Sequence, residues 1–146
     1  MASLKYKISE EINLDGVHYG SETEKSIGLI NEYAKRIMTT NGVTLTTILS
    51  FDTSVAAGQY LDGDVRYIRI TNLDSTNYVI LRITGDASTD YSVRLDAGAS
   101  HLIISTSSTG VVDYADITGV TLEDLSAISA TANTAACDLE IVVASA

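Results

Sequence analysis

The chain has 146 residues, of which 45% are hydrophobic and 19% are charged, and its formal net charge is −10 at pH 7. This composition excludes an intrinsically disordered chain, which is poor in hydrophobic residues, and the negative charge argues against nucleic acid as a partner because it repels phosphate. Proline and tryptophan are absent, and threonine and valine are concentrated where apolar and polar residues alternate, which favours β-strands.

The sequence carries no signal of a disulfide, a secretory leader or a membrane span. Cys137 is the only cysteine, and its apolar neighbours predict a small buried side chain. The first ten residues are charged rather than apolar, and no run of 18 apolar residues occurs. We therefore expect one domain over residues 1–146, made in a reducing cytoplasm and without contact to a membrane.

The N-terminal region predicts extended structure. Residues 4–14 alternate apolar and polar side chains, which is typical of a strand. The Asp15-Gly16 pair that follows is suited to a tight turn. Residues 17–20 and 26–30 predict two short or bulged strands, each marked by a glycine.

Residues 33–51 predict a β-hairpin. An Asn41-Gly42 pair, which readily supplies the two positive φ angles of a type I′ turn, lies between flanks rich in threonine and β-branched residues. A short helix over residues 30–38 is the alternative, because apolar residues recur there at spacings of three and four. We prefer the strand interpretation.

Residues 66–83, RYIRITNLDSTNYVILRI, have the clearest pattern in the chain. Two alternating runs flank a polar loop at 73–77 and predict a second hairpin. Both runs carry apolar atoms on both faces, so we expect a central position in a sheet, covered by a second layer or by a neighbouring chain. The apolar side chains that share a face are Ile68 and Ile70 in the first run, and Val79, Leu81 and Ile83 in the second.

The remaining elements are short. Strands are predicted at 91–95, 101–106 and 137–145, and residues 109–120 predict a strand or a long loop. Residues 121–128 predict the one helical turn, with Thr121 as its N-cap and an apolar stripe at spacings of three. The expected fold class is all-β: an antiparallel β-sandwich or jelly roll of about eight strands with one short helical turn near residues 121–128.

The residues that catalysis requires are sparse. Only two histidines occur, His18 and His101, and neither is accompanied by a nucleophile elbow, a metalloprotease motif or an oxyanion-type glycine loop. Both are better explained as residues at strand edges. We therefore expect no catalytic residues, no cofactor and no enzymatic activity.

One acidic turn offers oxygen ligands. Asp62-Gly63-Asp64, with Asp52 ten residues earlier, has carboxylates of the kind that calcium binds. Arg66 lies where a further oxygen ligand would be needed, and a turn before a strand explains the same residues. We assign no metal ligands, and cation binding by this turn is left open.

Small β-sandwiches also bind sugars by stacking aromatic rings on them. Tyrosine serves equally at sandwich edges and subunit contacts, where its hydroxyl stays in water, so both uses are left open. The candidate platforms are Tyr19, Tyr60, Tyr78, Tyr91 and Tyr114.

Four segments together show a pattern of strands joined by turns. They are DVRYIRITNLDSTNYVILRI (64–83), YSVRLDAGASHLI (91–103), CDLEIVVAS (137–145) and, near the start, INLDGVHYG (12–20). The pattern resembles the small β-sandwich virion structural proteins of tailed bacteriophages, particularly marine and cyanobacterial phages. The resemblance spans most of the chain, and it transfers no functional residue.

This resemblance implies a role on a virus particle. The expected function is that of a capsid decoration or cement protein on the outer surface of the shell; the alternatives are a neck, tail or baseplate component, or a carbohydrate-binding adhesin module. The expected partners are further copies of the chain, commonly in a trimer, and the major capsid protein or other virion proteins. The negative charge favours the outside of the shell, because packaged DNA would repel it.

Overall fold

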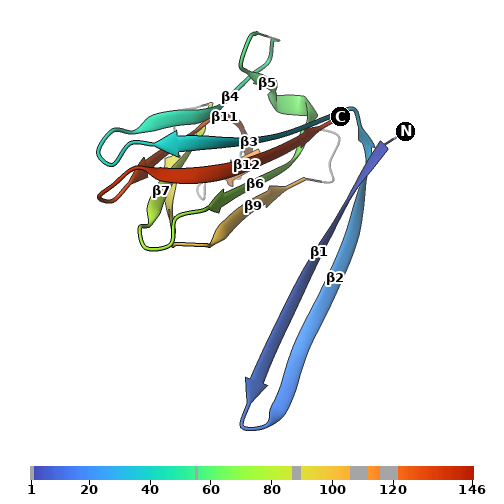
Figure 1. Ribbon diagram of the computed structural model, residues 1–146. Helices are drawn as coiled ribbons and strands as arrows, with labels where there is room; N and C mark the ends of the chain where they lie inside the picture. Colours follow the sequence, from blue (N-terminus) through green and yellow to red (C-terminus); the bar gives the residue numbers. More distant parts are fainter. Residues whose placement is uncertain (1, 55, 87–89, 106–111, 116–121) are drawn as a thin grey trace.

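The computed structural model describes residues 2–54, 56–86, 90–105, 112–115 and 122–146, and it shows a body of β-strands with a long N-terminal arm (Figure 1). Within these ranges the only helical element is a 3-10 turn at Asp62–Asp64, and no helix there is long and apolar enough to cross a membrane. The strands are β1 (Ala2–Leu14), β2 (Val17–Ile30), β3 (Glu32–Thr40), β4 (Thr46–Asp52), β5 (Tyr60–Leu61), β6 (Val65–Asn72), β7 (Val79–Gly85), β8 (Asp90–Leu95), β9 (Ser100–Ile104), β10 (Val112–Ala115), β11 (Leu122–Ala132) and β12 (Cys137–Ser145).

The body is a sandwich of two sheets. One sheet has the strand order β3-β12-β6-β9, and the other has the order β5-β4-β11-β7-β8, with β10 paired to β11. Neighbouring strands are antiparallel except for a short parallel contact between β4 and β5. The all-β sandwich predicted from the sequence is confirmed, and the described residues contain more strands than the eight expected.

The inner faces of the two sheets form one apolar core. Alternation places every second side chain of a strand on this face, and the residues assigned to it from the 66–83 pattern are at most 1% exposed. The C-terminal strand is also confirmed, since Leu139, Ile141 and Val143 of β12 point into the same core. Cys137 is buried beside them as predicted, and burial raises the pKa of its thiol.

The two hairpins expected within the body are wrong. β3 and β4 lie in different sheets, and so do β6 and β7, so the loops at 41–45 and 73–78 each cross from one sheet to the other. The helix alternative for residues 30–38 is wrong as well, because β3 pairs along its whole length with β12. Alternation of apolar and polar residues determines which face of a strand is buried but not which strand lies beside it.

A buried asparagine fixes the crossing from β6 to β7. Asn72 is 0% exposed, and its side-chain amide donates to the carbonyl oxygens of Asn77 (2.8 Å) and Leu95 (3.2 Å). Its Oδ1 accepts the backbone N–H of Asp74 at 3.0 Å. One side chain therefore joins the end of β6, the following loop and the end of β8, and it satisfies polar groups that these chain reversals bury.

The helical turn expected near residues 121–128 is wrong. This segment lies largely in β11, a strand between β4 and β7, while Thr121 lies outside the described residues. The register of β11 shifts once against β7 and once against β4. The shift against β7 falls between Leu125 and Ala127. It lets Leu125 and Ile128, three residues apart, both point into the core with 1% and 0% exposure, so a bulged strand acquires the apolar spacing of a helix.

Two isoleucines of β7 point to opposite faces of its sheet, which leads to a prediction about stability. Ile83 is 0% exposed and Ile80 is 37% exposed. Ile83→Ala should lower the free energy of unfolding by about 2 to 5 kcal/mol, because it removes buried methyl groups and leaves a cavity. Ile80→Ala, the matched control, should cost less than about 1 kcal/mol. Urea denaturation measures both, and equal losses would contradict the assigned facing.

Candidate functional site

The N-terminal arm is a two-stranded ribbon that leaves the sandwich (Figure 1). β1 and β2 pair antiparallel over their whole lengths, from Ala2 opposite Ile30 to Leu14 opposite Val17. The expected strand over residues 4–14 and the Asp-Gly turn are confirmed: Asp15 and Gly16 have φ angles of 51° and 83°, as a type I′ turn requires.

The second strand of the arm is continuous, where two short strands were expected. Gly20 stays in the ladder opposite Glu11. A Cβ at this position would lie 2.7 Å from the backbone carbonyl oxygen of Glu10, so this close approach of the two strands requires glycine. The irregularity expected at Gly28 falls on the next residue. Leu29 has a positive φ of 62°, and it lies opposite the register shift near the start of β1.

The arm has one apolar face and one charged face. Directly opposite residues of paired strands share a face, so the register sorts the side chains. The apolar face carries the pairs Leu4–Ile27, Tyr6–Lys25, Ile8–Thr23, Glu10–Ser21, Ile12–Tyr19 and Leu14–Val17. The charged face carries Lys5–Ser26, Lys7–Glu24, Ser9–Glu22, Glu11–Gly20 and Asn13–His18.

The base of the arm is packed on the body. Ile27 and Ile30 are 4% and 7% exposed, and with Leu4 and Tyr6 they cover the outer face of the β3-β12-β6-β9 sheet. The ring centroids of Tyr6 and Tyr67 lie 6.2 Å apart, and burial raises the pKa of the Tyr67 hydroxyl. The arm of the same chain thus covers the outer face of β6, as expected for the first run of 66–83, and it also covers β12. On the outer face of the second run, in β7, Ile80 stays 37% exposed. The residues covered are Tyr67, Val142, Ala144 and Ile104.

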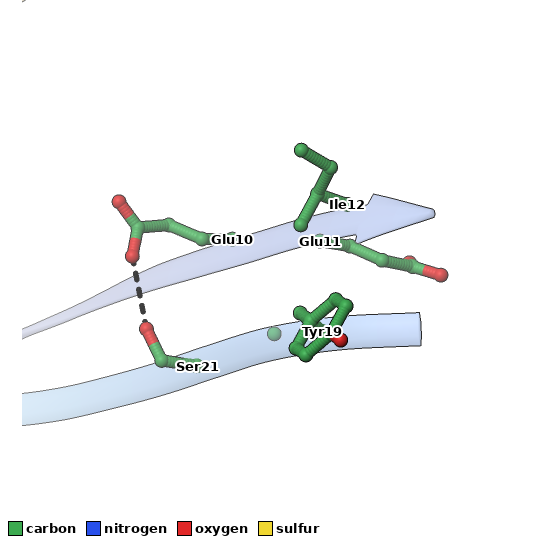
Figure 2. Close-up of a pocket in the computed structure, with 6 residues that line it drawn as sticks. Glu10, Glu11, Ile12, Tyr19 and Ser21 are labelled. Atoms are coloured by element: carbon green, nitrogen blue, oxygen red, sulfur yellow. Dashed lines mark hydrogen bonds between the residues drawn. The ribbon is translucent and has the colours of Figure 1, made fainter. Parts of the chain in front are cut away.

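Beyond its base, the apolar face of the arm is open. The side chains along it are 43% to 57% exposed, and an open depression lies between the two strands near the tip (Figure 2). There the hydroxyl of Ser21 donates to Oε2 of Glu10 at 2.9 Å, which positions one carboxylate on this face between Ile8 and Ile12. The exposed apolar residues are Ile8, Ile12, Leu14, Val17 and Tyr19. Several exposed large apolar side chains on one face of an element are typical of an interaction site.

A charged triad lies on the outer face of the sheet next to the arm. Glu140 of β12 accepts from Lys35 Nζ at 2.8 Å and from Arg69 Nη2 at 2.6 Å. The hydrogen bond from Lys35, with the charge of both cations, holds the pKa of the Glu140 carboxyl below its ordinary value. On the edge strand β3 the triad is flanked by two large apolar side chains, Tyr33 and Ile37, which are 59% and 60% exposed.

The two histidines lie in different parts of the molecule. His18 is near the tip of the arm, 3.3 Å from the amide of Asn13 and 3.5 Å from Oε1 of Glu11. His101 is on β9, where burial lowers the pKa of its imidazole and Nε2 is buried without a hydrogen-bond partner among the described residues. The structure therefore does not combine them into one site.

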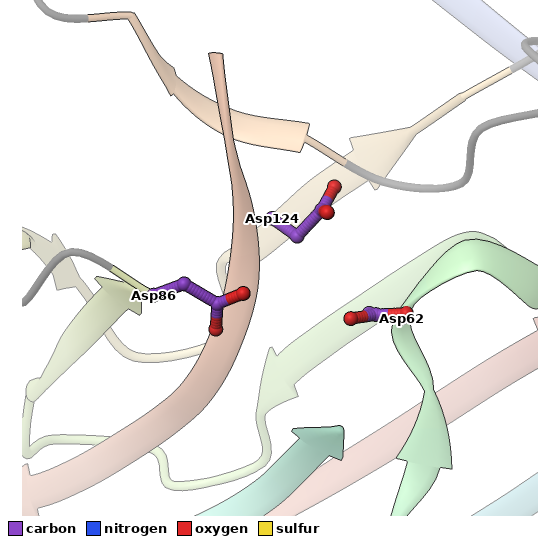
Figure 3. A group of neighbouring side chains, drawn as sticks. All are labelled: Asp62, Asp86 and Asp124. Carbon is purple, nitrogen blue, oxygen red and sulfur yellow. The ribbon is translucent and has the colours of Figure 1, made fainter. Parts of the chain in front are cut away.

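The acidic turn contributes to a group of three carboxylates (Figure 3). One oxygen from each of Asp62, Asp86 and Asp124 lies within 4.8 Å of the others, whereas Asp52 instead accepts the N–H of Ser54 at 3.3 Å. The sequence pattern missed Asp86 and Asp124, because they come together only through the pairing of β7 with β11. Calcium takes six to eight oxygens, so three carboxylates alone do not define a calcium site, and we assign no metal ligands.

Most of the tyrosines considered as platforms for sugar stacking are covered by other side chains. Tyr19 is 56% exposed on the arm. Tyr78 is covered by the guanidinium of Arg94, 4.1 Å from its ring centroid, and Tyr60 and Tyr91 pack against the core. The side chain of Tyr114 lies outside the described part of the chain.

No protein-family model matches this chain, and no curated protein matches it either. Among the described residues, the arm combines exposed apolar side chains with a base that is packed on the body. The signal available in the sequence was the alternation over residues 4–14, which predicts an apolar face but not that this face is left uncovered.

The docking of the arm leads to a prediction about two isoleucines on its apolar face. Ile27→Ser should loosen the base of the arm and speed amide hydrogen exchange in residues 2–7 and 26–31, because a 4% exposed side chain is lost from the contact with the sheet. Ile8→Ser, at a 43% exposed position beyond the contact, is the matched control and should leave exchange at the base unchanged. Equal acceleration by both variants would contradict the docked base.

The triad leads to a prediction about pH. The pKa of Glu140 is lowered in the folded state, so this carboxylate stabilises the fold above the ordinary glutamate pKa, and the contribution is lost as the pH falls through the lowered pKa. Glu140→Gln should cost about 1 kcal/mol or less at pH 7 and should flatten the loss of stability between about pH 5 and pH 3. The control is Glu24→Gln on the exposed arm. Identical urea midpoints of wild type and Glu140→Gln across this range would refute the prediction.

Proposed function

We propose that this chain is a virion structural protein of a tailed bacteriophage, acting as a decoration or cement protein that stabilises the capsid shell through protein–protein contacts. The observation that supports this role best is the open apolar face of the arm. Monomeric proteins seldom gather exposed large apolar side chains on one face without a partner to cover them, and the arm that carries these side chains projects away from the body (Figure 1).

The architecture suits a mechanical task. The core ties both sheets together through crossing connections such as the one at Asn72, while the arm is a separate ribbon attached at its base. From Ile8 to Leu14 the open face spans six residue steps, or about 20 Å. Many such contacts around a shell, each of modest area, would resist internal pressure because they must break together.

The charge supports a position on the outside of the shell. The chain has 19 acidic residues against 9 lysines and arginines, and a subunit of this charge is repelled by packaged DNA. A component of the neck, tail or baseplate would use the same arm and carry the same charge. The two positions differ in copy number, because a decoration protein is present in numbers comparable to the major capsid protein.

The proposed function is tested on virions purified by density gradient from infected cells that express this chain. The chain should be found in the virion band at a copy number comparable to the major capsid protein, and antibodies to it should label the heads of intact particles. Labelling confined to tails, at a few copies per particle, would replace the capsid position by a tail position. A chain that stays at the top of the gradient is not a virion protein.

A further inference from the structure

We propose that the open apolar face of the arm binds a second copy of this chain, on the outer face of its edge strand β3 around Tyr33 and Ile37. This inference deepens the proposed function, since it names the first partner of the arm. The interface is heterologous, because the arm and β3 are different surfaces and every copy offers both.

The first argument is continuity with the contact that the arm already makes. Tyr67 and Ala144 lie side by side on adjacent strands under the base of the arm. Tyr33 pairs with Ala144 from the other side and belongs to the same row of the sheet, yet it stays 59% exposed. The apolar face of the arm is thus already fitted to this sheet surface, and both the rest of that face and the start of the row are left open.

The second argument is the order of side chains on the two surfaces. On the arm, Ile8, Glu10 and Ile12 follow each other on one face. On β3, the sequence Tyr33, Lys35, Ile37 does the same on the outer face. Both strands space such residues by about 6.7 Å, so pairing the flanking apolar residues places Glu10 of one copy next to Lys35 of the other.

The third argument is charge. The triad around Lys35 joins two cations to one carboxylate, that of Glu140, so its formal charge is +1. On the arm, Glu10 is held on the apolar face by the hydroxyl of Ser21. The open face of the arm also carries Lys25, opposite Tyr6, but Glu10 is the charged residue between Ile8 and Ile12. It would lie beside Lys35 of the other copy, and the attraction of these opposite charges favours this register although the whole chain carries −10.

The test uses two double variants and a control. The arm variant is Ile8→Ser with Ile12→Ser, and the sheet variant is Tyr33→Ser with Ile37→Ser; all four side chains are 43% to 60% exposed, so the fold is retained. The control is Val43→Ser with Leu73→Ser, at positions 91% and 47% exposed outside both surfaces. Circular dichroism and thermal melting establish that each variant is folded.

Sedimentation velocity at micromolar concentration gives the result. Wild type and control should associate, each double variant should be monomeric, and a one-to-one mixture of the two variants should form a heterodimer, because one copy keeps its arm and the other keeps its β3 surface. A monomeric wild type overturns the proposal. So does a sheet variant that associates like wild type, or a mixture that stays monomeric.

A double-mutant cycle tests the register. Glu10→Gln and Lys35→Gln should each weaken association by about twofold to fivefold, and the two changes combined in one chain should weaken it about as much as either alone, because the pair is lost only once. A combined variant whose loss equals the product of the two single losses overturns the register.

The outcomes separate this inference from the proposed function. A chain that is monomeric in solution but present in virions refutes the contact between copies and leaves the virion role standing. A chain that associates through its arm but is absent from virions refutes the virion role and leaves the contact between copies standing.

Discussion

The organising constraint of this structure is that strand β12 is buried on both of its faces. Ile141 and Val143 point into the sandwich core, while Val142 and Ala144 point outward and are covered by the base of the arm. A strand that is apolar on both sides needs a second cover, and here the chain provides it with its own first thirty residues. Because this cover anchors the arm, it also determines where the rest of the arm projects.

The body and the arm are stabilised by different interactions. In the body, connections cross between sheets, so neither sheet can separate without exposing the shared core, and Asn72 binds two of these crossings through one side chain. In the arm, stability comes from a single ladder of backbone pairs and from the contact at the base. A two-stranded ribbon is marginally stable alone, so the contact at the base is needed to hold the arm in place.

The sequence predicts local properties of this fold well and properties that depend on tertiary arrangement poorly. The burial of Ile68, Leu81 and Ile141 follows from alternation alone, because the face of a strand is a local property. The partner of each strand is not local, and the hairpins expected around 41–42 and 73–77 failed for that reason. At 121–128 the bulges in β11 imitate helical spacing. The sequence predicted the first strand of the arm and its turn. It did not predict that the apolar face of the arm is exposed, nor that Asp62, Asp86 and Asp124 lie together, because both depend on tertiary arrangement and not on the periodicity of one segment.

The thinness of the arm has a mechanical consequence. A single layer of two strands resists stretching along its length, because its covalent backbone is already extended, whereas the hydrogen bonds run across the ribbon and leave it free to bend across its flat side. The base is held against the body by Tyr6 and Ile27, so bending displaces the tip rather than the base. A ribbon with this anisotropy keeps its tip at a fixed distance from the body while the angle between the two can vary.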